Sequence, residues 1–106
     1  MSERLIFELQ ANLCRAMSHP TRQEILHLLF EKPKTVNEIA HQTHLGQSSV
    51  SRHLAVLRQN GIVDSERNGQ EIIYRVANPK IAEVCSLMRN VLIEQVNERN
   101  KLIEKL

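Results

Sequence analysis

Hydrophobic positions between residues 46 and 63 follow a helical period. Within GQSSVSRHLAVLRQNGIV, Val50, Leu54 and Leu57 fall at i, i+4 and i+7, so a helix over residues 47–59 would align them in one stripe. Gly61 then ends this helix, because glycine adopts the left-handed conformation of a C-terminal cap at little cost. The opposite face carries short or hydrogen-bonding side chains that can approach a base-pair edge closely: Ser48, Arg52, Ala55 and Gln59, with Ser49, Ser51 and His53 on its flanks.

Two more helices are expected earlier in the chain, at residues 3–17 and 20–31. The first has two apolar stripes, which indicates contacts on two sides. The second begins at Pro20, and proline is well tolerated at the first position of a helix. The apolar positions are Ile6, Leu9, Leu13 and Met17, then Phe7, Ala11 and Cys14, in the first helix, and Ile25, Leu28 and Leu29 in the second.

A short helix should precede the helix over 47–59. Thr35 with Glu38 three residues later forms a capping box, which predicts a helix from there to about Thr43. Leu45-Gly46 supplies the turn that follows. Two short helices joined by three or four residues, the second with a polar exposed face, are the helix-turn-helix arrangement.

After Gly61 the hydrophobic period changes from near 3.6 to near 2. Asn68-Gly69 separates two strand-like segments and predicts a type I′ hairpin turn, in which both central residues need a positive φ. An ordinary hairpin would leave the polar tip residues Arg67, Asn68 and Gln70 in solvent. Directly after a helix-turn-helix, a wing that contacts phosphate or the minor groove is favoured.

A last helix is expected over residues 79–105, opened by Asn78-Pro79. Its apolar stripe is wider than the rest of so small a domain can cover: Ile81, Val84, Cys85, Met88, Val91, Leu92 and Val96. We therefore expect a homodimer through residues 3–17 and 79–105. The more polar segment after Val96 either extends this interface or frays.

Composition narrows the class of protein. With 106 residues, 42% of them hydrophobic, residues 1–106 fit a single winged helix-turn-helix domain, mainly α with a small β-hairpin. A net charge of +2 permits a polyanionic partner without demanding one. No segment predicts a membrane span or a signal peptide, so a cytoplasmic location is expected. No Gly-rich phosphate loop, nucleophile elbow or paired carboxylate set indicates an enzyme, and no cofactor is expected.

Two cysteines and five histidines are the candidates for sensor chemistry. His41 and His44 are three residues apart and could ligate a metal, but two neutral surface imidazoles are the preferred interpretation, so no metal site is predicted. Cys14 and Cys85 lie on the two helices expected at the dimer interface. They would either sense reactive sulfur, an oxidant or arsenite, or pack as small apolar residues.

The order of these segments resembles the ArsR/SmtB family of winged-helix transcriptional repressors over nearly the whole chain. The most specific matches are SHPTR at 18–22 and QSSVSRHL at 47–54. The resemblance implies a dimer that binds a two-fold operator in double-stranded DNA and is released by an inducer. The cysteine pair and the Asp and His residues that metal-sensing members carry are absent here. By position, the family's major-groove residues would be Gln47, Ser48, Ser49, Ser51, Arg52 and His53, with Arg67 and Gln70 on the backbone or in the minor groove.

The side chains suit these roles unequally. Arg52 can donate twice to guanine and Gln47 can pair with adenine, each supplying about 1–3 kcal/mol of discrimination. The serines are expected at phosphate near the helix N-terminus, although Ser48 could instead cap the helix. His53 either contacts DNA or is an ordinary exposed residue. The main rival function is a winged-helix protein-interaction module, which predicts weak and salt-insensitive affinity for DNA.

Overall fold

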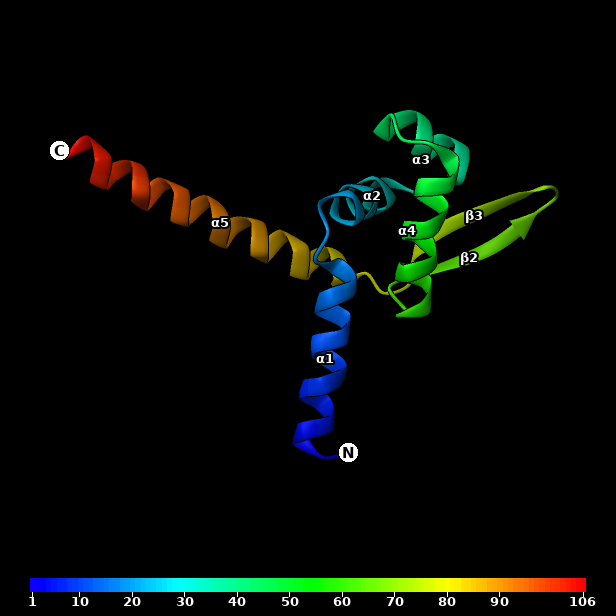
Figure 1. Cartoon of the computed structure of the whole chain (residues 1–106), viewed down its shortest axis with the longest axis horizontal. Coiled ribbons are helices and arrows are strands. Elements are labelled where there is room, and N and C mark those ends of the chain that lie inside the picture. The colour runs from blue at the N-terminus through cyan, green and yellow to red at the C-terminus, as the bar shows by residue number, and fades with distance from the viewer.

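The computed structural model describes residues 1–106 as five helices and a three-stranded antiparallel sheet of order β1-β3-β2 (Figure 1). The helix-turn-helix unit lies beside the hairpin, while the first and last helices project away from both. The elements are α1 Glu3–Met17, α2 Pro20–Glu31, β1 Lys34–Thr35, α3 Val36–Thr43, α4 Gln47–Gln59, β2 Val63–Asn68, β3 Glu71–Val76 and α5 Lys80–Glu104.

A small core holds α2, α3 and α4 together. Val50, Leu54 and Leu57 of α4 are completely buried, as their spacing predicts. In α2 the prediction was partly wrong, because Leu26 is buried beside Ile25 and Leu29 whereas Leu28 is only half-buried. The other buried apolar residues are Ala16, Met17, Ile39, Ala40, Ile62 and Val63.

The sheet departs from the predicted two-stranded hairpin in two respects. β1 adds a short third strand, in which Lys34 pairs with Tyr74 and Thr35 pairs with Ile73. The turn also lies one residue later than predicted, because Asn68 pairs with Glu71 and leaves Gly69-Gln70 as the loop. Gly69 has φ +66° and no non-glycine residue of the loop has a positive φ. Glycine at the first central position is the pattern of a type II′ turn, not type I′.

The two outer helices are only lightly packed within one chain. α5 has 25 residues and none of them is buried, and α1 buries only Ala16 and Met17 at its C-terminal end. The radius of gyration is 16.7 Å, against about 13 Å for a compact chain of this length. The side chain of Asn78 accepts a hydrogen bond from Lys80 N at 2.9 Å and so opens α5, which stays helical to Glu104.

Apolar side chains remain exposed along both outer helices. On α5 they cover several turns, and Leu87 keeps 65% of its surface in solvent. None of the helices combines the length and the hydropathy that a membrane crossing would need. The exposed apolar residues are Leu5, Ile6, Phe7 and Leu9 on α1, and Val84, Leu87, Met88, Val91, Leu92, Ile93, Val96, Leu102 and Ile103 on α5.

Candidate nucleic-acid interface

The turn between α3 and α4 is fixed by local hydrogen bonds. Thr35 Oγ1 accepts from Glu38 N and Glu38 Oε1 accepts from Thr35 N, both at 3.2 Å, so the predicted capping box is present. At the other end of α3, His44 takes the left-handed conformation with φ 58° and its N–H donates to Ala40 O. The turn that sets the direction of α4 therefore has three residues, His44, Leu45 and Gly46.

The face of α4 opposite the core is an open polar strip. Gln47, Ser48, Ser51 and Arg52 are exposed, and Arg52 takes part in none of the chain's four ion pairs. Because the buried face of the same helix is anchored in the core, this strip is presented on a rigid support. A guanidinium without an internal partner is free to donate two hydrogen bonds to an outside acceptor.

The first turn of α4 has unpaired backbone donors. Gly46 is the N-cap residue and no side chain bonds to the first amides, so Ser48 does not cap the helix. The earliest helical amide with a backbone partner is that of Val50, which donates to Gly46 O at 3.1 Å. Amides at a helix N-terminus attract anions such as phosphate, and Ser48 stands among them with its hydroxyl exposed.

His53 is engaged inside the protein rather than facing freely outward. It is half-buried, and its ring lies 4.6 Å from the ring of His19, centroid to centroid, with a tilt of 50°. His19 itself caps α2, since its Nδ1 accepts from Thr21 N at 3.1 Å. Burial lowers the pKa of His53 from its ordinary 6.5, and the electrostatic influence of His19, Arg22 and Arg52 lowers it further. Ser49, also half-buried, flanks the same edge of the strip.

This environment predicts a pH-dependent stability. Since the pKa of His53 is lower in the folded chain, unfolded molecules take up the proton more readily just below pH 6.5. Its contribution to the free energy of unfolding is complete above pH 6.5 and is lost as the pH falls through the folded pKa. Urea unfolding between pH 7.5 and 5 should show this loss. His53→Gln should flatten the profile, whereas His41→Gln, an exposed control, should leave it unchanged; identical profiles for both variants would contradict the assignment.

The tip of the wing carries the second predicted contact surface. Arg67 and Gln70 are exposed on either side of Gly69, at the far end of the hairpin from the core (Figure 1). Arg67 forms no ion pair, whereas Arg75 is held by Glu66 at 2.7 Å across the two strands. Of the wing arginines, Arg67 is therefore the one that remains available to a polyanion.

The SHPTR segment and Gln23, which follows it, have structural roles that the sequence did not reveal. Arg22 Nη1 donates to Ala16 O at 3.1 Å, and Gln23 Nε2 donates to Met17 O at 2.7 Å. These two side chains tie the end of α1 to α2, while His19 reaches α4 through His53. A histidine just before Pro20 resembles a cap signal, but its contact with a residue 34 positions later has no local signature.

The two cysteines lie in different surroundings. Cys14 is exposed on α1 and Cys85 is half-buried on α5, and both are free thiols. Cys85 packs against the edge of the core. Figure 1 shows α1 and α5 running in different directions from the body of one chain, so these helices do not lie along each other within a protomer.

Comparison with known proteins agrees with this geometry. Residues 19–65, which span α2 to the start of β2, match the family described as "Bacterial regulatory protein, arsR family". The transcriptional regulator Rv0081 of Mycobacterium tuberculosis is 35% identical over 107 residues, covering 100% of this chain and 94% of that protein. Its crystal structure superimposes with a TM-score of 0.83, covering 92% of this chain and 98% of the other.

Two further relatives extend the comparison. A biofilm growth-associated repressor of Xylella fastidiosa is 35% identical over 85 residues, which is 80% of this chain and 75% of the repressor. The homodimeric winged helix-turn-helix domain of Mb0332 from Mycobacterium bovis has a TM-score of 0.83 at 27% identity, covering 92% of this chain and 93% of that one. The full-length match to Rv0081, the arsR-family segment and the shared fold lead to one conclusion: this chain belongs to the ArsR family of DNA-binding transcriptional regulators.

Proposed function

We propose that the protein works as a homodimer in which the two copies of α4 read the halves of a two-fold operator. The observation that carries this proposal is the polar strip of α4, which is exposed while the opposite face is completely buried. A helix of this kind fits the major groove, and the neighbouring wing extends to the backbone or the minor groove. The apolar faces of α1 and α5 support the dimer, and the relative Mb0332 is homodimeric.

Base reading is assigned to Arg52 and Gln47. Both are exposed on the strip, and their side chains have the paired donors or donor and acceptor that guanine and adenine edges require. Ser48, Ser49 and Ser51 are assigned to phosphate near the first turn of α4, where the backbone amides favour an anion. We infer that His53 supports the edge of the polar strip, because its ring already contacts the ring of His19.

Repression with release by a small inducer is the proposed mode of action. A dimer that covers a promoter blocks transcription without any further domain, and the Xylella fastidiosa relative is named a repressor. An inducer acts by binding the DNA-free arrangement of the dimer more tightly than the DNA-bound one. The helices that set the distance between the two copies of α4, namely α1 and α5, are therefore the place where it should act.

Arginine substitutions on α4 and the wing provide the test. Arg52→Ala should weaken binding to the operator by about 1–3 kcal/mol and relax the choice of sequence. Arg67→Ala should weaken binding to all duplexes alike and reduce the slope of log K against log salt by about one. Fluorescence anisotropy on the upstream region of the protein's own gene and on a scrambled duplex, at several salt concentrations, measures both effects.

Arg58→Ala serves as the matched control, since Arg58 is exposed near the C-terminal end of the same helix, beyond the polar strip. Its binding should follow the wild type. If Arg52→Ala and Arg67→Ala behave alike on both duplexes, the division into base reading and backbone contact is wrong. If the wild-type protein binds DNA weakly and without salt dependence, the protein is an interaction module and the proposal fails.

The cysteines offer a separate prediction about the inducer. Burial raises the pKa of the Cys85 thiol, and the positive charge of Arg89 offsets only part of this effect, so Cys85 is a poor nucleophile. This supports packing rather than sensing for Cys85, and a sensor that needs both thiols would then fail, so Cys14→Ser and Cys85→Ser proteins should leave the operator under the same inducing conditions as the wild type. Gel-shift titrations with polysulfide and arsenite check this. If these reagents release only the wild type, Cys14 and Cys85 form the thiol sensor that the sequence alone left open.

A further inference from the structure

Basic side chains gather where the start of α2 meets the middle of α4. His19 and Arg22 come from the start of α2, and Arg52 and His53 come from α4. The rings of His19 and His53 are in contact, with 4.6 Å between their centroids. Arg22 and Arg52 both act electrostatically on His53, and no acidic side chain acts on it in the same way. We call these four residues the basic corner.

No carboxylate of the chain neutralises the basic corner. None of its members takes part in an ion pair. Arg22 is half-buried: its Nη1 donates to Ala16 O at 3.1 Å, whereas its Nε is the only fully buried side-chain polar atom that has no hydrogen-bond partner. A guanidinium is always charged, and withdrawing a charge from water is unfavourable unless it meets an opposite charge. The corner therefore lacks an anion, which a binding partner can supply.

Both imidazoles keep a nitrogen available for such an anion. His19 Nδ1 accepts from Thr21 N, so the neutral ring carries its proton on Nε2, and this nitrogen has no partner in the chain. No hydrogen bond holds the ring of His53 either. Because Arg22 Nε is the only polar atom of the side chains that is both unpartnered and fully buried, the free imidazole nitrogens still reach solvent.

We propose that the basic corner binds a phosphate of the DNA backbone, in a contact separate from the polar strip of α4 and the tip of the wing. The phosphate accepts from His19 Nε2–H and from His53, and its charge balances that of Arg22. Ser49, already assigned to phosphate, precedes His53 by one turn of α4, so the corner continues the same edge of the helix. The inference rests on the proposed function, because it adds a contact to the same DNA interface.

This contact couples DNA binding to the uptake of a proton. In the free protein, burial and the surrounding charges hold the pKa of His53 below 6.5. A bound phosphate brings the opposite charge and raises this pKa again. The complex then holds more protons than the free protein, so affinity increases as the pH falls between the two pKa values, by at most about tenfold per pH unit. Every duplex has phosphates, so the operator and a scrambled duplex gain alike.

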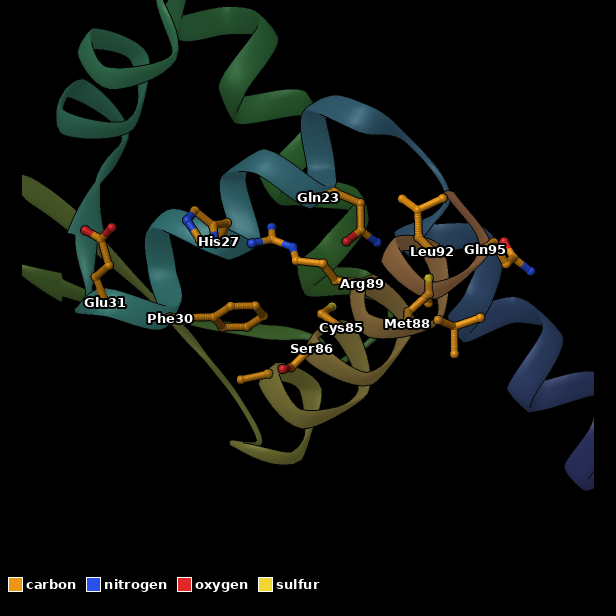
Figure 2. Close-up of a pocket in the computed structure, with 12 residues that line it drawn as sticks. Gln23, His27, Phe30, Glu31, Cys85, Ser86, Met88, Arg89, Leu92 and Gln95 are labelled. Atoms are coloured by element: carbon orange, nitrogen blue, oxygen red, sulfur yellow. The ribbon is translucent and has the colours of Figure 1, made fainter. Parts of the chain in front are cut away.

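Fluorescence anisotropy titrations at pH 7.5 and pH 6.0 test the coupling with the full chain. The wild type should bind both duplexes about five- to tenfold more tightly at the lower pH, and His53→Gln should reduce this gain to about twofold or less. His19→Asn should also reduce the gain but keep α2 intact, because asparagine caps a helix well. His27→Gln is the control and should keep the gain, since His27 lies on the same helix but in the groove beside α5 (Figure 2).

NMR titration of the histidine rings locates the effect. Adding duplex should raise the pKa of His53, whereas inorganic phosphate at the same phosphate concentration should not. Duplex binding without this rise, or an equal gain in affinity for wild type and His53→Gln, would overturn the contact and leave the regulator standing. An equal rise with inorganic phosphate would mean an adventitious ion only and would overturn the assignment to the DNA backbone. Weak and salt-insensitive binding at both pH values would instead overturn the proposed function, and this contact with it.

Discussion

A variant carrying both Leu87→Glu and Val91→Glu is expected to be monomeric and to lose binding to a two-fold operator. The two side chains keep 65% and 51% of their surface exposed and lie one turn apart on α5, in the stripe that no element of the same chain covers. Burying an unpaired carboxylate in an apolar interface costs about 3 kcal/mol or more, which is more than about 100-fold in the dissociation constant. Sedimentation velocity across a range of protein concentrations measures this change.

A variant with the same added charge elsewhere on α5 provides the control. Asn90→Glu with Asn97→Glu also introduces two carboxylates into this helix, but at polar positions outside the apolar stripe, and should remain dimeric. The monomeric variant should also lose helical circular dichroism, because a long helix with no buried residue depends on its partner for packing. An unchanged dissociation constant for Leu87→Glu with Val91→Glu would place the dimer interface elsewhere.

The elements built from neighbouring residues could be predicted from the sequence. The period of Val50, Leu54 and Leu57 identified α4 and its buried face, and the capping box between Thr35 and Glu38 marked the start of α3. These signals work because their partners lie within three or four positions of each other, where the helix itself fixes the geometry. The polar strip of α4 followed for the same reason, and so did the unpartnered stripe of α5.

Features that depend on distant pairing could not be predicted in the same way. β1 is two residues long and exists because Lys34 and Thr35 meet β3 some 40 residues later. The type of hairpin turn depends on a register set by that whole sheet, so Gly69 rather than Asn68 became the first loop residue. The contact of His19 with His53 also joins two different helices, and no local pattern encodes it.

The distinction between locally encoded elements and long-range contacts also separates the proposed DNA-binding surface from the parts that would regulate it. The surface assigned to DNA lies mainly on one helix and the hairpin tip, so single substitutions there should change affinity or sequence choice without affecting the fold. We expect the parts that control this surface to lie at the junctions between helices, where Gln23 ties α1 to α2 and His19 lies against α4. Coupling between an inducer and the operator requires such junctions to have two arrangements of different affinity.

The buried face of α4, which holds the polar strip in place, carries a prediction about stability. Leu54→Ala should lower the free energy of unfolding by about 2–5 kcal/mol, because Leu54 is completely buried in a core of only twelve apolar residues and alanine would leave a cavity. Ala55→Ser, at the exposed neighbouring position, should change it by less than about 0.5 kcal/mol. Urea unfolding at one fixed protomer concentration measures both, since dimerisation makes stability depend on concentration. A loss below about 1 kcal/mol for Leu54→Ala would mean that α4 is not held by this core. The Leu54→Ala molecules that remain folded should bind the operator with nearly wild-type affinity, because the polar strip itself is unchanged.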